Sequence, residues 1–261
     1  MKEVLNPRRL WLLIRNDVVA DYRILLLASG ALAVLMLLFS ATRIARFDPS
    51  DFYYARWYLA MLFVWGPIVA SSSFKELHDK TKNEAYLLLP ASALEKTITR
   101  LFRTTIAFFV YLLVYLTVVS ALIEAINQLW FGRHNAVFNP LNLPANISAW
   151  VVVGNFIVAT SLYFLGAAWF RKTHFVKTAV ALTVIPFALI LFAVFLASIL
   201  FRGSYSFALQ QDAAYAYYLA HKTLAQGLLD ALKAIYFFVL PVFCWAVAWL
   251  RVVETQVSDG V

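Results

Sequence analysis

The stretch TTIAFFVYLLVYLTVVSALIEAI, residues 104–126, carries a single charged side chain, Glu124. A helix rises about 1.5 Å per residue and the hydrocarbon core of a bilayer is about 30 Å thick, so roughly 20 apolar residues cross it. A stretch of this length and composition therefore predicts a membrane-spanning helix.

The rest of the sequence repeats this pattern. Five further apolar runs of similar length cover residues 24–42, 53–73, 149–170, 178–201 and 231–250. The chain of 261 residues is 63% hydrophobic and only 14% charged, a charged share about half that of soluble domains. Too few polar side chains remain to cover a soluble globule of this size. The sequence predicts an all-α integral membrane protein with six transmembrane helices, in one transmembrane domain over residues 1–261.

Lysine and arginine alternate between the segments that connect these runs. Of the 22 Lys and Arg residues, 15 lie in the leader 1–23, in segments 74–103 and 171–177, and after residue 250. Because basic residues favour the cytoplasmic side of a membrane, both termini are expected in the cytoplasm. The prediction is a multi-pass protein of a bacterial inner (cytoplasmic) membrane. The positive-inside distribution of Lys and Arg then accounts for the net charge of +8, so nucleic-acid binding is not expected.

The leader has a periodic pattern of its own. One stripe of a helix over residues 7–22 would hold Leu10, Trp11, Ile14, Val18 and Tyr22, although Asp21 falls within it. This pattern predicts an interfacial helix lying at the inner membrane surface. The alternative is an irregular basic leader that only fixes orientation.

The connection between the second and third runs, residues 74–103, is the most informative segment. Pro90 lacks an amide donor and restricts Leu89, so it interrupts any helix there. Ser92 and Glu95 then have the S-x-x-E spacing of a capping box, which begins a new helix that continues into the third span. The apolar triplet 87–89 is more than a solvated loop needs. We therefore expect a rigid cytoplasmic corner with a docking surface.

Two motifs give the chain a resemblance to a known family. The first reads Tyr-Leu-x-Leu-Pro-x-Ser-x-x-Glu-Lys followed by an Arg, and comprises Tyr86, Leu87, Leu89, Pro90, Ser92, Glu95, Lys96 and Arg100. The second, Arg-x-x-Glu-Thr-Gln, comprises Arg251, Glu254, Thr255 and Gln256. With a basic leader and six apolar runs, the chain resembles permease subunits of the type-2 ABC export class.

This resemblance implies a role for each segment. The leader would be an elbow helix, segment 74–103 would carry a cytoplasmic coupling helix that docks on an ATPase, and the last outer loop would form short external helices. The implied docking residues are Glu84, Tyr86, Leu87, Leu88, Leu89, Pro90, Ser92, Glu95, Lys96 and Arg100. The implied partners are two copies of an ABC ATPase subunit and a second permease, either another copy of this chain or a related one.

The chain itself has no pattern for binding or hydrolysing ATP. A P-loop needs the spacing G-x-x-x-x-G-K-[ST], and the eight glycines never adopt it. ATP and Mg²⁺ would be bound by the partner ATPase, so no cofactor, metal or catalytic residue is expected in this chain. The histidines His78, His134, His174 and His221 are isolated, and Cys244 is expected to be a small buried hydrophobe.

Three features belong to the opposite side of the membrane. Glu124 closes the third run, where an interfacial carboxylate is the simpler interpretation and a gate residue the alternative. Residues 203–233 have helical periodicity and fit two short interfacial helices. Residues 127–148 contain Asn139-Pro140 and Leu143-Pro144 and are expected to be extended and rich in turns.

Three classes of function follow from these patterns. The first is the permease subunit of an ATP-driven exporter, and lipids, peptides and other hydrophobic compounds all fit its apolar, aromatic-rich interior. The second is a non-transporting assembly or sensor subunit with a cytoplasmic docking loop. The third, an integral-membrane enzyme, is disfavoured because the sequence lacks clusters of acids, histidines and metal ligands.

The charge asymmetry can be tested by cysteine labelling in a Cys244→Ala background. A cysteine at position 211 should react with a membrane-impermeant thiol reagent on intact spheroplasts, because the positive-inside rule places this position outside. Cysteines at positions 80 and 258 should react only after the membrane is opened. External labelling at position 80 would contradict the six-span topology.

Overall fold

The computed structural model describes residues 6–46, 52–78, 91–140, 148–170, 173–200 and 222–258. Within these ranges the chain forms helices and no strands. The helices are α1 (Pro7–Ala45), α2 (Tyr53–Ser71), α3 (Lys75–His78), α5 (Ala93–Phe102), η1 (Arg103–Ala107), α6 (Phe108–Phe131), α7 (Ala149–Trp169), α8 (His174–Leu200), α11 (Lys222–Ala234), η2 (Ile235–Val239) and α12 (Leu240–Ser258).

Six helical stretches in these ranges are long and apolar enough to cross a membrane. They are Leu25–Ala45, Tyr53–Leu77, Ala93–Phe131, Ala149–Trp169, His174–Leu196 and Lys222–Thr255. The prediction of an all-α protein with six such helices is confirmed.

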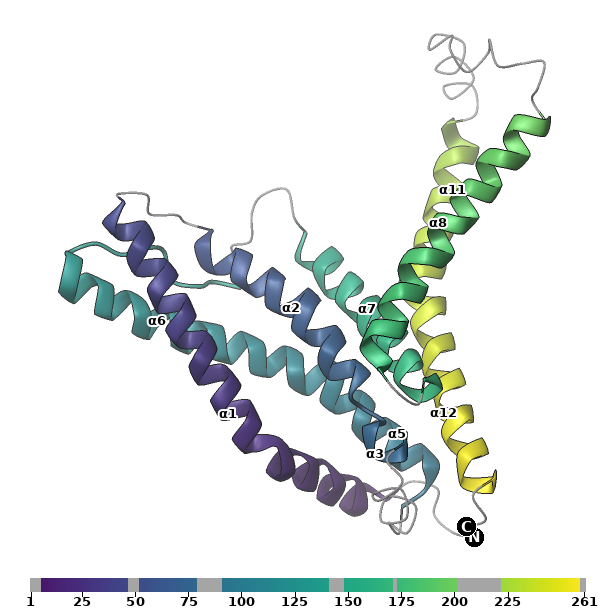
Figure 1. Cartoon of the computed structure of the whole chain (residues 1–261), viewed down its shortest axis with the longest axis horizontal. Coiled ribbons are helices and arrows are strands. Elements are labelled where there is room, and N and C mark those ends of the chain that lie inside the picture. Colours follow the sequence, from purple (N-terminus) through teal and green to yellow (C-terminus); the bar gives the residue numbers. More distant parts are fainter. Residues whose placement is uncertain are drawn as a thin grey trace.

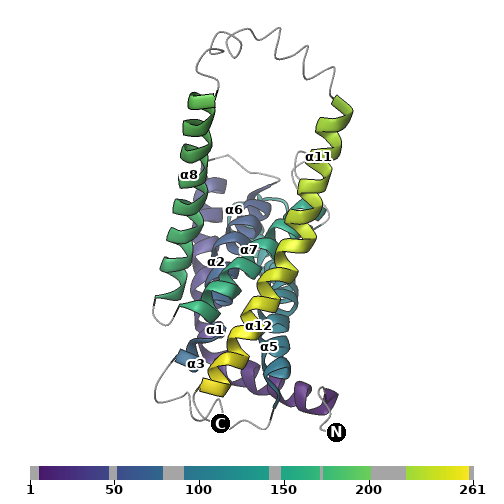
Figure 2. The same cartoon turned by 90° about the vertical axis from the view of Figure 1, so that its right-hand side faces the viewer.

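Three of these helices continue beyond the predicted runs. In α1 the leader and the first run form one helix. Its N-cap residue is Asn6, whose side chain accepts a hydrogen bond from the Arg8 amide. Its first turns lie at an angle to the rest (Figures 1 and 2). Helices α5, η1 and α6 follow one another without a gap, as do α11, η2 and α12. The second short helix expected after the fifth run is thus continuous with the sixth spanning helix, whereas residues 201–221 lie outside the described ranges.

Helix α7 joins the two parts of the structure. Helices α1, α2 and α6 lie side by side, while α8 and the α11–α12 helix extend away from them (Figure 1). Helix α7 packs against α2, α8 and α12 and so connects both parts. In contrast, the most apolar window of α8 is 0% buried, as expected for a helix surrounded by hydrocarbon.

Buried apolar side chains form two clusters. The larger lies among α1, α2, α6 and α7 and includes Met36, Tyr54, Leu62, Leu116 and Phe156. The smaller lies where the end of α2 meets α7 and α12, and includes Phe74, Leu77, Phe164, Ala248 and Val252.

Three glycines let α7 approach its neighbours closely. A Cβ atom built at each would lie 2.7 Å from the Phe156 ring at Gly66, 2.7 Å from the Phe237 ring at Gly154, and inside the Thr178 side chain at Gly166. Small residues at helix interfaces allow such close packing in membranes. The contacts of α7 with α2, η2 and α8 therefore each depend on a missing side chain.

Replacing Gly166 by alanine should destabilise the protein by roughly 1 to 3 kcal/mol, the usual cost of overpacking. Gly30→Ala is the matched control, because nothing lies within 4 Å of the added methyl group. The control should be neutral or slightly stabilising, since alanine favours helix more than glycine does. Thermal unfolding of the purified protein in detergent measures both effects. Equal unfolding midpoints for the two variants would show that the α7–α8 contact tolerates a side chain.

Candidate functional site

The candidate site on the predicted cytoplasmic side comprises residues 91–103, which include all of α5 and the first residue of η1. We call this segment the α5 corner. The Glu95 amide donates to Ser92 Oγ at 3.1 Å, and the Ser92 amide donates to Glu95 Oε2 at 2.9 Å. Both hydrogen bonds of the predicted capping box are therefore present. They fix the residue at which α5 begins, because they satisfy backbone amides that a helix start leaves without partners.

Glu95 also connects the α5 corner to the start of α1. Its Oε1 atom accepts from the Asn6 amide at 2.8 Å, and Asn6 is the N-cap residue of α1. The Glu95 side chain is only 1% exposed. One carboxylate thus caps α5 and holds the first residue of α1, 89 positions away in the sequence.

Arg100 connects three elements. Its Nη1 atom lies 3.3 Å from Asp17 Oδ2 on α1, and its Nη2 atom lies 2.6 Å from Glu76 Oε2 on α3. Arg103 Nη1 lies 3.9 Å from the same Asp17 oxygen. The side chains of Asp17 and Arg100 are largely buried. Because losing one partner of a buried ion pair leaves a charge without compensation, the Asp17–Arg100 pair holds α1 against α5. The Glu76 side chain is 46% exposed, so its pair with Arg100 holds α3 more weakly.

The short π-helical segment η1 joins the α5 corner to the spanning helix. The Thr104 hydroxyl donates to the Arg100 carbonyl at 3.0 Å, and the Thr105 hydroxyl donates to the Leu101 carbonyl at 2.6 Å. In a π-helical turn the backbone hydrogen bonds join residues five apart instead of four. The two threonine hydroxyls provide additional donors to backbone carbonyls at this turn. Such π-bulges are rare and frequently lie at functional sites.

The structure describes only some of the predicted docking residues. Ser92 forms the cap, and Glu95, Lys96 and Arg100 are all buried within the chain. The remaining predicted docking residues lie outside the described ranges; they are Glu84, Tyr86, Leu87, Leu88, Leu89 and Pro90.

A second polar site lies toward the end of α6, and we call it the Glu124 cluster (Ser40, Tyr54, Glu124, Asn127 and Asn135). Glu124 is 3% exposed, so this carboxylate is buried among protein groups. Its Oε1 atom accepts from Ser40 Oγ at 2.7 Å and from the Tyr54 hydroxyl. Its Oε2 atom accepts from the Asn135 amide at 2.7 Å. All these groups are donors, which matches a carboxylate that only accepts.

The Glu124 cluster also holds the chain that follows α6. Helix α6 ends at Gly132, whose φ of +64° suits glycine, and residues 133–140 then fold back along the helix as a strap. The Asn135 amide donates to Glu124, and the Phe138 amide donates to Ser120 Oγ at 3.1 Å. Ser120, Glu124 and Asn127 share one face of α6, a spacing from which a polar face could have been recognised in the sequence.

Within the described residues, no group of three or more His, Cys, Asp or Glu side chains is arranged to hold a metal ion. Cys244 is buried, as expected for a small hydrophobe.

Replacing Glu124 by glutamine should lower the free energy of unfolding by roughly 2 to 3 kcal/mol, because hydrogen bonds to a charged group contribute about that much and the new amide would face donors. The matched control is Glu254→Gln on α12, where the carboxylate pairs with Arg251 at the surface. That exposed pair should change stability by less than about 1 kcal/mol. Thermal unfolding in detergent compares the two variants, and an equal effect would contradict the structural role of the Glu124 cluster.

The chain matches no known family model, and no curated protein or solved structure matches it either. Its function must therefore follow from its six spanning helices, the α5 corner and the Glu124 cluster.

Proposed function

We propose that this chain is the membrane-spanning permease subunit of an ATP-driven exporter, and that residues 84–96 dock on a separate ATPase subunit. The observation that carries the proposal is the α5 corner, a capped helix that is tied to α1 and continues through η1 into α6. The motif that resembles type-2 ABC permeases lies in the same segment.

The contacts of the α5 corner support a lever mechanism. Glu95 holds the first residue of α1, and Arg100 pairs with Asp17 further along that helix. A displacement of α5 would therefore act on α1 through side chains and on α6 through the backbone. Arg100 also pairs with Glu76 on α3, which follows α2 after three residues. Closure of the ATPases on bound ATP would supply the displacement.

The docking residues play two proposed roles. Glu95, Lys96 and Arg100 are buried and pack inside this chain, so we assign them a positioning role. We assign the contact with the ATPase to the part of the motif outside the described residues, namely Glu84, Tyr86, Leu87, Leu88, Leu89 and Pro90. This division predicts that changes in the first group alter the orientation of the α5 corner, whereas changes in the second group remove binding energy directly.

The positive-inside pattern supports a cytoplasmic α5 corner in a bacterial inner membrane. The Glu124 cluster then lies on the opposite side, where it closes α1, α2 and α6 against the strap. ATP and Mg²⁺ belong to two copies of the ATPase. A second permease, either another copy or a related chain, would supply the second corner that two ATPases need. The proposed cargo is a lipid, a peptide or another hydrophobic compound.

Affinity purification of the full chain from its native membrane tests the docking assignment. The unmodified chain should co-purify with an ABC ATPase, which mass spectrometry identifies. The double variant Leu88→Asp, Leu89→Asp should insert normally and lose this ATPase, because charged groups replace the apolar contact. The matched control is Leu224→Asp with Leu228→Asp on the exposed face of α11, which should retain it.

Retention of the ATPase by the Leu88→Asp, Leu89→Asp variant would show that docking occurs elsewhere. Purification of the unmodified chain with other membrane proteins and no ATPase would contradict the exporter proposal. That result would favour the assembly or sensor subunit instead.

A further inference from the structure

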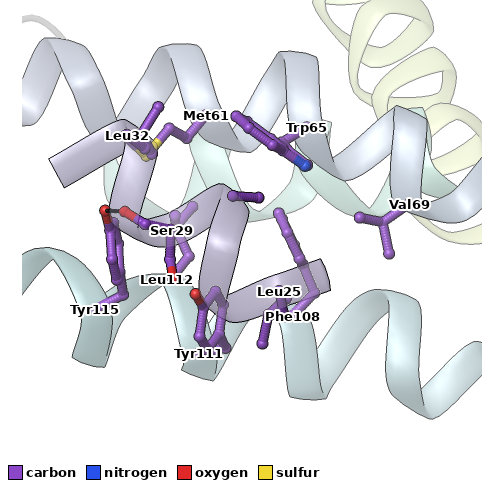
Figure 3. A pocket seen from close by; sticks show the side chains of 11 residues that line it. Leu25, Ser29, Leu32, Met61, Trp65, Val69, Phe108, Tyr111, Leu112 and Tyr115 are labelled. Carbon is purple, nitrogen blue, oxygen red and sulfur yellow. Dashed lines mark hydrogen bonds between the residues drawn. The ribbon is translucent and has the colours of Figure 1, made fainter. Parts of the chain in front are cut away.

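A lateral pocket lies among α1, α2 and α6, away from both polar sites. Figure 3 shows its wall on α1, which includes Leu25, Ser29 and Leu32, opposite Met61 and Trp65 of α2. Phe108, Tyr111 and Tyr115 of α6 form the remaining wall. All these residues belong to stretches that are long and apolar enough to span a membrane.

The pocket arises from the way α1 is held. Near one end Asp17 pairs with Arg100, and near the other Ser40 binds Glu124. Between these ties, the Tyr115 hydroxyl donates to the Ser29 carbonyl at 2.6 Å and bridges the two helices. The short side chains of Ala28 and Ser29 then leave space against α2 and α6.

The lining of the pocket is unsuited to water. Its volume is about 50 Å³, several times what one water molecule needs. Its walls are aliphatic and aromatic, and the Tyr115 hydroxyl already has a protein partner. Apolar cavities of this kind stay dry, and an empty one forfeits packing contacts. An apolar occupant would restore those contacts.

The shape of the pocket limits what can enter. Leu25 is 43% exposed and Trp65 is 37% exposed, so the pocket opens sideways to its surroundings. A helix with its side chains is about 10 Å across and cannot enter such a space. A single hydrocarbon chain is narrow enough to fit.

We propose that the pocket holds part of one acyl chain of a membrane lipid. The chain would enter sideways from the membrane and pack between Ala28 and the rings of α6. This inference rests on the six spanning helices and not on the exporter function, so either proposal can fail without the other.

Photo-crosslinking of the purified full chain tests the proposal. The probe is a phosphatidylglycerol with a photoactivatable diazirine in one acyl chain, added to the protein in detergent. Peptide mass spectrometry should find saturable crosslinks at Tyr111 and Tyr115. Ala28→Phe fills the pocket and should reduce these crosslinks about tenfold. The matched control is Leu27→Phe, one residue away and 77% exposed, which should not reduce them.

One further variant completes the test. Ala28→Leu adds less volume and should give a smaller loss, which keeps the test valid if Ala28→Phe does not fold. Crosslinks spread evenly over exposed helices such as α8, or unchanged in folded Ala28 variants, would overturn the proposal.

Discussion

The buried Glu124 carboxylate is the interaction on which the arrangement of α1, α2 and α6 depends. It accepts hydrogen bonds from side chains of all three helices and from the strap. A buried carboxylate without donors is costly, so Glu124 requires these donors at fixed positions. Its hydrogen bonds therefore hold α1, α2 and the strap against α6.

The second part of the molecule is held by a different means. Helix α7 packs closely against α2, η2 and α8 at Gly66, Gly154 and Gly166. One interhelical hydrogen bond supplements this packing, from the Tyr236 hydroxyl of η2 to Asn155 Oδ1 of α7 at 3.0 Å. Lipid tails are as apolar as leucine, so shape and not hydrophobicity discriminates between helix and lipid there. Buried polar contacts at both ends therefore hold α1, whereas close packing with one interhelical hydrogen bond holds α7.

The sequence predicted features that depend on neighbouring residues, but not contacts between residues far apart in the chain. Six spans follow from length and composition, and the Ser92–Glu95 capping box follows from a spacing of three residues. Neither signal identifies Asn6 or Asp17 as partners of the α5 corner, because those contacts join positions more than 80 residues apart. The burial of Glu124 was missed for the same reason, since its donors Ser40 and Tyr54 lie on other helices. The leader and the first span form one continuous helix, and no helix-breaking residue at their junction could have indicated where one ends and the other begins.

The π-helical turn η1 also sets the angular register between the α5 corner and the membrane. An α-helix advances by about 100° per residue, and a π-bulge inserts one residue into that progression. Deleting one residue from η1 would rotate all of α5 by about that angle around the axis of α6. Arg100 would then point away from Asp17, although the sequence of α5 would be unchanged. A related chain without the extra residue would need its arginine at another position of the helix to make the same contact.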